Sequence, residues 1–251
     1  MTGRCNLCNK TKELQRICHV IPDFFYRESE LFHKYHNLVY IDLKTFLKTG
    51  EKKVLSNKQK TGEFDLFKLC KDCDGKVIGA YESYGREFFY SQNLPKGKEL
   101  ILADKDGSIE CSNADYKKLK LLFLSILWRA SFSDRPLFSE IGLDENISEE
   151  IRKMLLNGVP KSDIEFPVFF MNTMFDKKIS NDYLFQPIKM RVANENGFMF
   201  AFGGMIVTFT QGIDELKDST LKYRIQENGI FRALKVPPGK TWKLITKWYK
   251  K

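Results

Sequence analysis

The amino-acid sequence predicts an α+β fold, in which a cysteine-containing region is followed by helices and then by an antiparallel sheet. Three observations predict it: two Cys-x-x-Cys pairs in the first third of the chain, two helix-like segments between residues 114 and 158, and short β-branched or aromatic runs after residue 165. With 251 residues, the chain can bury one large core or two modest ones. A hydrophobic content of 43% is typical of a folded protein.

The two Cys-x-x-Cys pairs predict a metal site. Cys5 and Cys8 form one pair, and Cys70 and Cys73 form the other. Two sulfurs at this spacing can bind one ion, and four thiolates complete the tetrahedral coordination that Zn²⁺ prefers. A redox dithiol or four unrelated buried thiols are the alternatives, but a redox pair is expected to begin a helix after a buried strand, whereas Cys5 follows a polar N-terminus. We therefore predict one structural Zn²⁺ shared by both pairs.

Nothing in the sequence suggests a membrane protein or a signal peptide. The most apolar run, residues 119–128, is interrupted by Lys120 and Ser125 and is too short to span a bilayer. We expect a soluble, cytoplasmic protein with no membrane partner, in which metal explains the six cysteines better than disulfides do. Cys18 and Cys111, which belong to neither pair, are interpreted as small buried residues.

The chain is expected to divide into residues 1–92 and residues 99–251, with 91–98 as a linker or wide turn. A mostly buried helix is predicted over residues 114–131, with Asn113 as its N-cap. A second helix is predicted from Ser148 to Asn157, where Gly158 ends it.

Strands are predicted over 166–174, 185–192, 198–209, 230–236 and 242–248, from their β-branched and aromatic residues. Residues 194–197 read as a hairpin turn, and Gly203 with Gly204 as a bulge or close backbone approach within a strand. The lysine-rich end of the chain, residues 240–251, reads as an edge strand. No catalytic cluster is evident in this half.

One succession of motifs supports a resemblance to a known group. Its members, in chain order, are Cys5-x-x-Cys8, Cys18-His19-Val20-Ile21-Pro22 and Leu69-Cys70-Lys71-Asp72-Cys73-Asp74. Over about the first 90 residues this order resembles the HNH endonucleases, which have a treble-clef zinc scaffold. The resemblance implies a ββα element held by zinc. It also implies a histidine that activates water and a divalent ion, Mg²⁺ or Mn²⁺, at the scissile phosphate.

The resemblance makes His19 the general base, but the chain departs from the pattern at each metal position. Cys18 replaces an Asp, Asp65 is the nearest match to an Asn, and Asp74 replaces the final His. Asp65 and Asp74 are hard oxygen donors suited to Mg²⁺, and Glu82 lies near the helix face of Asp74 as a further candidate. The alternative is that the carboxylates are ordinary surface residues and that His19 supports the zinc site.

The positive charge suggests an acidic partner. The formal net charge is +9, and the segment 44–60 includes the candidate phosphate contacts Lys52, Lys53, Lys58 and Lys60. A solvated basic loop is the alternative. His33 and His36 are interpreted as solvated helix residues.

The leading hypothesis is an HNH-like, metal-dependent endonuclease acting on nucleic acid, with DNA the expected partner. The resemblance suggests a role in bacterial defence against foreign DNA. The C-terminal half would then supply substrate selection, dimerisation or docking to an effector complex. The alternatives are a non-catalytic zinc-binding module that binds nucleic acid or a protein, and a zinc domain that only stabilises a larger effector.

Overall fold

The computed structural model describes residues 1–26, 36–51, 53–58, 61–90, 100–103, 108–173, 176, 183–192, 195–213 and 216–249. The chain forms two compact units, and each is assembled from three segments. The cysteine unit comprises residues 1–24, 61–94 and 115–161, and the sheet unit comprises 25–60, 95–114 and 162–251. The predicted α+β class is confirmed. The expected single division between residues 92 and 99 differs from this arrangement, because the helices after residue 115 join the cysteines.

Two small strand pairs belong to the cysteine unit. Strands β1 (Thr2–Arg4) and β2 (Thr11–Glu13) form an antiparallel hairpin around the first cysteine pair. Strands β3 (Cys18–His19) and β6 (Phe64–Asp65) pair antiparallel, although 44 residues separate them. The short helix η1 (Asp23–Tyr26) follows β3. The second cysteine pair begins five residues after β6 ends, at Cys70, so the strand pairs bring both ends of this region together.

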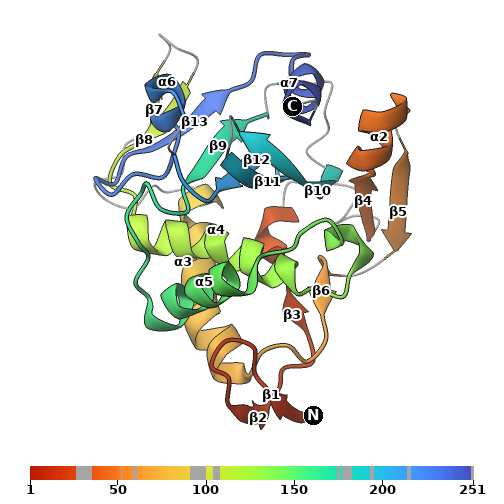
Figure 1. Ribbon diagram of the computed structural model, residues 1–251, viewed down its shortest axis with the longest axis vertical. Coiled ribbons are helices and arrows are strands. Elements are labelled where there is room, and N and C mark those ends of the chain that lie inside the picture. Colours follow the sequence, from red (N-terminus) through yellow and green to blue (C-terminus); the bar gives the residue numbers. More distant parts are fainter. Residues whose placement is uncertain are drawn as a thin grey trace. The chain divides into compact units, whose positions relative to one another are not determined.

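Three helices form the core of the cysteine unit (Figure 1). The π-helix η2 (Asp72–Ile78) continues into α3 (Gly79–Tyr90), which packs against α4 (Tyr116–Ser131). Helix α4 also packs against α5 (Glu145–Asn157), and a short helix, η3 (Pro136–Phe138), connects them. The two helices α3 and α4 approach closely because Gly85 has no side chain: an added Cβ would lie 2.2 Å from Leu122. Every residue from 119 to 130 of α4 is buried.

Both predicted helices are present, with different starts. Asp115, rather than Asn113, caps α4, because its carboxylate accepts a hydrogen bond from the Lys118 N–H at 3.1 Å. Helix α5 begins at Glu145 instead of Ser148, and the prediction that it ends at Gly158 is confirmed by the left-handed φ of 67° there. None of the described helices has the length and apolarity to cross a bilayer.

The sheet unit is built on one nine-stranded sheet, in the order β5-β4-β10-β11-β12-β9-β13-β8-β7. The pairings β4–β10 and β9–β13 are parallel and the others are antiparallel, so the expected antiparallel sheet is found to be mixed. The strands span β4 (Asn37–Ile41), β5 (Val54–Lys58), β7 (Leu100–Ala103), β8 (Ser108–Cys111), β9 (Val168–Asn172), β10 (Tyr183–Val192), β11 (Glu195–Phe202), β12 (Met205–Thr210) and β13 (Phe231–Lys235).

The run predicted as one strand over 198–209 is two strands. Gly203 and Gly204 have φ values of 55° and 73°, and Phe202 pairs with Met205 across them. Two positive φ values between paired strands form a two-residue hairpin turn, so the prediction of a bulge or close backbone approach within a strand is wrong. The hairpin predicted between β10 and β11 is confirmed, but the turn predicted over residues 194–197 is misplaced, because Val192 pairs with Glu195 and Glu195–Gly197 belong to β11.

The predicted C-terminal edge strand is a helix, α7 (Thr241–Tyr249). Asp176, which is 1% exposed, caps this helix: its carboxylate accepts hydrogen bonds from Gly239 N–H at 2.6 Å and Thr241 N–H at 3.1 Å. Ile245 is fully buried in the core of the sheet unit, and Trp242 packs against that core. The other α-helices in the described part of this unit are α2 (Leu43–Thr49) and α6 (Asp218–Leu221).

Candidate metal centre

The four predicted zinc ligands lie together. The sulfur atoms of Cys5, Cys8, Cys70 and Cys73 are all within 4.8 Å of one another. Cys8 is partly exposed and the other three are buried. Among the described residues, these four form the one group of three or more His, Cys, Asp or Glu whose ligand atoms could share an ion. Four sulfurs at this separation suit tetrahedral Zn²⁺, for which Zn–S bonds are about 2.3 Å.

Backbone hydrogen bonds hold the two cysteine pairs against each other. The Asn6 N–H donates to the Lys68 carbonyl at 3.0 Å, and the Gln15 N–H donates to the Leu69 carbonyl at 2.8 Å. The Cys70 N–H also donates to the Cys5 sulfur at 3.3 Å. Amide donors of this kind stabilise thiolates, so the site is prepared for ionised sulfur.

The electrostatics of the cluster suit a bound cation. Burial raises the pKa of Cys5 and that of Cys73, because a thiolate is poorly solvated there. For Cys8, burial acts in the same direction, but hydrogen bonds from the Lys10 backbone and the neighbouring thiols make its pKa lower than usual. A divalent ion would supply the missing positive charge and keep all four sulfurs ionised.

Two further cysteines are buried outside the cluster. Cys18 is 3% exposed, and burial raises the pKa of its thiol. Cys111 is also 3% exposed and lies in β8 of the sheet unit. A buried thiol with a raised pKa is unreactive, so the interpretation of Cys18 as a packing residue agrees with its surroundings.

The imidazole of His19 interacts with residues that sequence reasoning did not single out. Its Nε2 lies 2.5 Å from the Thr61 hydroxyl and 3.5 Å from an oxygen of Asp23, and 29% of the side chain is exposed. The same Asp23 oxygen accepts the Gly62 N–H at 2.7 Å. The signal for Asp23 was present in the sequence, since it follows His19 by four residues, but nothing local indicated Thr61.

The structure does not bring Asp65 to this imidazole. In the antiparallel pair of β3 and β6, Cys18 is opposite Asp65, and His19 is opposite Phe64. Because side chains alternate along a strand, Asp65 lies on the other face of the pair from His19. Asp65 is 4% exposed and accepts the Asp134 N–H at 3.1 Å, which is a structural contact.

A buried arginine stands beside the remaining candidates. The Arg129 guanidinium, whose side chain is 3% exposed, donates to Glu82 at 2.8 Å and to the His19 carbonyl at 2.6 Å. Burial raises the pKa of Asp74, against the opposing effect of the Arg129 charge. Glu82 is therefore paired with a guanidinium, and in the described part of the chain His19, Asp74 and Glu82 do not form a shared ligand set. The only sequence signal for Arg129 was a cation at the end of an apolar helix.

The basic segment of residues 44–60 belongs to the sheet unit, where it forms α2 and β5 rather than a single loop. Lys53 and Lys58 are exposed, whereas Lys52 and Lys60 lie outside the described residues. His36 is exposed with a positive φ of 52° and is not helical, and His33 also lies outside the described residues.

The net charge is carried by the sheet unit. Its segments contain 25 Lys and Arg against 17 Asp and Glu, and those of the cysteine unit contain 16 against 15, which together give the chain totals of 41 and 32. The cysteine unit is therefore nearly neutral, with a net charge of +1, and the sheet unit has +8.

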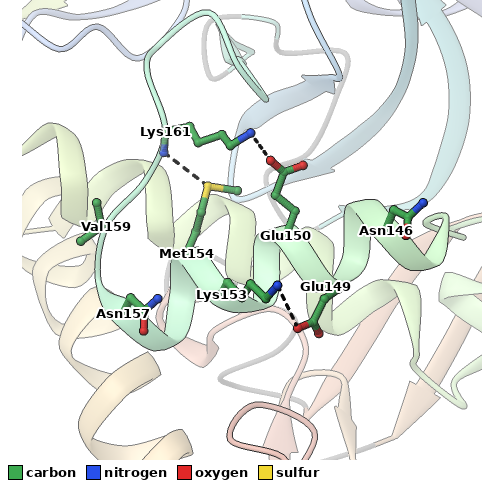
Figure 2. Close-up of a pocket in the computed structure, with 8 residues that line it drawn as sticks. All are labelled: Asn146, Glu149, Glu150, Lys153, Met154, Asn157, Val159 and Lys161. Atoms are coloured by element: carbon green, nitrogen blue, oxygen red, sulfur yellow. Dashed lines mark hydrogen bonds and ion pairs between the residues drawn. The ribbon is translucent and has the colours of Figure 1, made fainter.

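The outer face of α5 carries an open hollow of about 630 Å³ (Figure 2). Its charged side chains pair with one another: Lys153 with Glu149 at 3.7 Å, and Lys161 with Glu150. Val159, also at this hollow, is 59% exposed. Exposed ion pairs that satisfy each other do not select a ligand, so this hollow is not a candidate site.

Comparison with protein-family models, with curated proteins and with solved structures found no match to this chain.

Proposed function

We propose that this chain is a nucleic-acid-binding protein in which a treble-clef-type zinc centre is structural, and in which the HNH-like site does not carry out metal-dependent hydrolysis. One observation supports the second half of this proposal above all others: the buried Arg129 guanidinium lies between Glu82 and the His19 carbonyl.

A metal-dependent nuclease needs a cation beside its general base, held by two or more oxygen or nitrogen ligands. Here a guanidinium already neutralises Glu82 from 2.8 Å away. A second cation at this position would be repelled by the positive charge of the Arg129 guanidinium. Asp65 is on the far side of the strand pair, so it does not supply the missing ligand.

The charge of the sheet unit supports a polyanionic partner. Lys53 and Lys58 are exposed near the ends of β5, in the segment that the sequence identifies as the best candidate for phosphate contacts. Each lysine that neutralises a phosphate releases a condensed counterion, so the affinity is expected to fall steeply with salt.

The test is a salt titration of the full chain with duplex DNA, single-stranded DNA and duplex RNA of the same length. We expect binding at 50 mM salt that weakens linearly on a log–log plot. Lys53→Gln with Lys58→Gln is expected to reduce the slope by about 1 to 2, because roughly one counterion is released per contact. Lys153→Gln in the cysteine unit is the matched control and leaves the slope unchanged. Absence of binding to all three substrates would overturn the proposal.

The endonuclease hypothesis remains the second candidate, because the His19 ring is partly exposed and lies 3.5 Å from the carboxylate of Asp23. A histidine held by a carboxylate can act as a general base. Cleavage of plasmid and single-stranded DNA in Mg²⁺ or Mn²⁺ separates the two candidates. We expect none; cleavage by the wild type that is lost in both His19→Ala and Asp23→Asn would replace our proposal with a nuclease.

A further inference from the structure

We propose that a cavity in the sheet unit binds a small uncharged molecule, of about the size of a single aromatic ring, through its apolar body and one polar group. The cavity has a volume of about 200 Å³ and lies between one face of the sheet and the segment that includes α6. This inference is independent of the proposed nucleic-acid function.

Three adjacent strands form the floor of the cavity. Thr208 of β12 is paired with Phe169 of β9, and Met171, two residues further along β9, is paired with Leu234 of β13. Paired residues lie on the same face of a sheet, as do residues two apart, so all four side chains face the same side. All four line the cavity. Phe169, Met171 and Thr208 are buried to more than nine-tenths.

The segment from Ser219 to Tyr223 provides the opposite wall. Two backbone hydrogen bonds fix this segment to β9: the Phe170 N–H donates to the Tyr223 carbonyl at 3.2 Å, and the Ile225 N–H donates to the Val168 carbonyl at 3.0 Å. The wall is thus attached to the strand that forms the floor, and the cavity is part of the fold rather than a gap between separate pieces.

The polar group of the ligand is indicated by Thr208. Its side chain is 3% exposed, and its Oγ1 is buried without a hydrogen-bond partner in the described part of the protein. Buried hydroxyls normally have a partner, and an unpaired one is destabilising. Because this hydroxyl belongs to a residue that lines the cavity, a ligand that donates to it or accepts from it would satisfy it.

The chemistry of the lining defines the class of ligand. Every side chain that lines the cavity is uncharged, and aromatic and aliphatic groups predominate. A charged ligand would lose its hydration without a compensating partner, so a neutral one is expected. For size, an engineered apolar cavity of about 150 Å³ is sufficient to bind benzene. A cavity of about 200 Å³ therefore accommodates a ring with one hydroxyl, amine or carbonyl substituent.

The test uses phenol, benzene and sodium benzoate as probes for the full chain, with affinities from titration calorimetry and the site from crystals soaked in phenol. We expect phenol and benzene to bind in the cavity and benzoate not to bind. Thr208→Val keeps the shape but removes the hydroxyl, so phenol is expected to bind about fivefold more weakly and benzene equally well.

Two further variants make the result specific. Ser219→Trp changes an exposed position at the cavity wall, so it fills the cavity without disturbing the core and should abolish binding of both probes. Thr210→Val is the matched control, since Thr210 is buried two residues further along β12 and does not line the cavity. It should leave both affinities unchanged.

The proposal is overturned if neither phenol nor benzene binds, if Ser219→Trp binds them as well as the wild type does, or if soaked crystals show only ordered water in the cavity. Equal weakening of phenol by Thr208→Val and Thr210→Val would also overturn the role of the Thr208 hydroxyl.

Discussion

Removal of one sulfur from the metal centre is expected to abolish zinc binding and to unfold the cysteine unit. The change is Cys73→Ser, which preserves the side-chain shape but replaces a thiolate with a hydroxyl that is a poor zinc ligand. The matched control is Cys18→Ser. Cys73 is 4% exposed and Cys18 is 3% exposed, so each substitution buries one hydroxyl, but only Cys73 belongs to the cluster.

The expected magnitude follows from the loop that the ion closes. Cys8 and Cys70 are the members of the two pairs that lie nearest along the chain. By the chain-entropy estimate for cross-links, closing a loop of about 60 residues stabilises the folded state by roughly 4 kcal/mol. That is comparable to the whole stability of a small domain, about 5 kcal/mol at the lower end. The cysteine unit is therefore not expected to remain folded without its ion.

Native mass spectrometry measures the zinc content, with one ion per chain expected for the wild type and for Cys18→Ser, and none for Cys73→Ser. Hydrogen exchange measured by mass spectrometry then reports the folding of residues 1–24, 61–90 and 115–161, which should exchange rapidly only in Cys73→Ser. The reasoning is refuted if Cys73→Ser retains one tightly bound zinc, or if Cys18→Ser loses zinc and protection to the same extent.

Three further perturbations test the packing of the cysteine unit by chemical denaturation. Arg129→Met is expected to cost about 3–5 kcal/mol, because it leaves the paired carboxylate of α3 without its cation; a cost below about 1 kcal/mol would contradict the role of this pair. Gly85→Ala is expected to cost about 1–3 kcal/mol by overpacking against α4, whereas Gly75→Ala, with nothing within 4 Å, should be neutral or stabilising. A hydrogen bond from Arg152 lowers the pKa of Glu149. The ionised Glu149 carboxylate therefore stabilises the fold above the ordinary glutamate pKa, and this stabilisation is lost as the pH falls through the lowered pKa of Glu149. The difference in stability between the wild type and Glu149→Gln should therefore be largest above the ordinary glutamate pKa and shrink as the pH is lowered below it, and a difference that does not change with pH would argue against this ion pair.

The four-cysteine cluster could be predicted because its signal is local. Each Cys-x-x-Cys pair places two sulfurs together through a single turn, so only the meeting of the two pairs had to be inferred. The buried helix α4 was predicted for a similar reason, since ten nearly continuous apolar residues leave no polar face. In both cases the physical cause lies within one short segment.

The composition of the two units could not be predicted, because it depends on pairing between distant strands. Strand β4 pairs with β10, so that Val39 is opposite Tyr183, and β8 pairs with β13, so that Cys111 is opposite Phe231. The sequence of each strand does not indicate which distant strand is its partner. The division expected at residues 92–99 relied on the order of the motifs along the chain. Segments that are distant in the sequence join the same unit, so the units do not follow that order.

The C-terminal helix shows how a distant side chain decides between two local patterns. Trp242, Leu244 and Trp248 alternate as in a strand, whereas Trp242 and Ile245 also have helical spacing. The carboxylate of Asp176 accepts the N–H groups at the start of α7, and it lies 65 residues before Thr241 in the chain. The sequence around residue 241 contains no acidic cap of its own, so periodicity alone could not identify the helix.

In the candidate site, some expectations drawn from the resemblance depend on residue spacing and others on strand register. The clustering of the four cysteines depends on the spacing within each pair, and the structure places their sulfur atoms together. Whether a carboxylate can join His19 as a metal ligand depends instead on strand register. Because Cys18 is paired with Asp65, the Asp65 carboxylate lies on the face of the strand pair opposite to His19. Arg129 of α4, a helix outside the resembling region, donates to the His19 backbone carbonyl and to Glu82. Since a fixed cation and a divalent ion compete for the same negative charge, our proposal of a binding module rather than a nuclease depends on the pairing of Arg129 with Glu82.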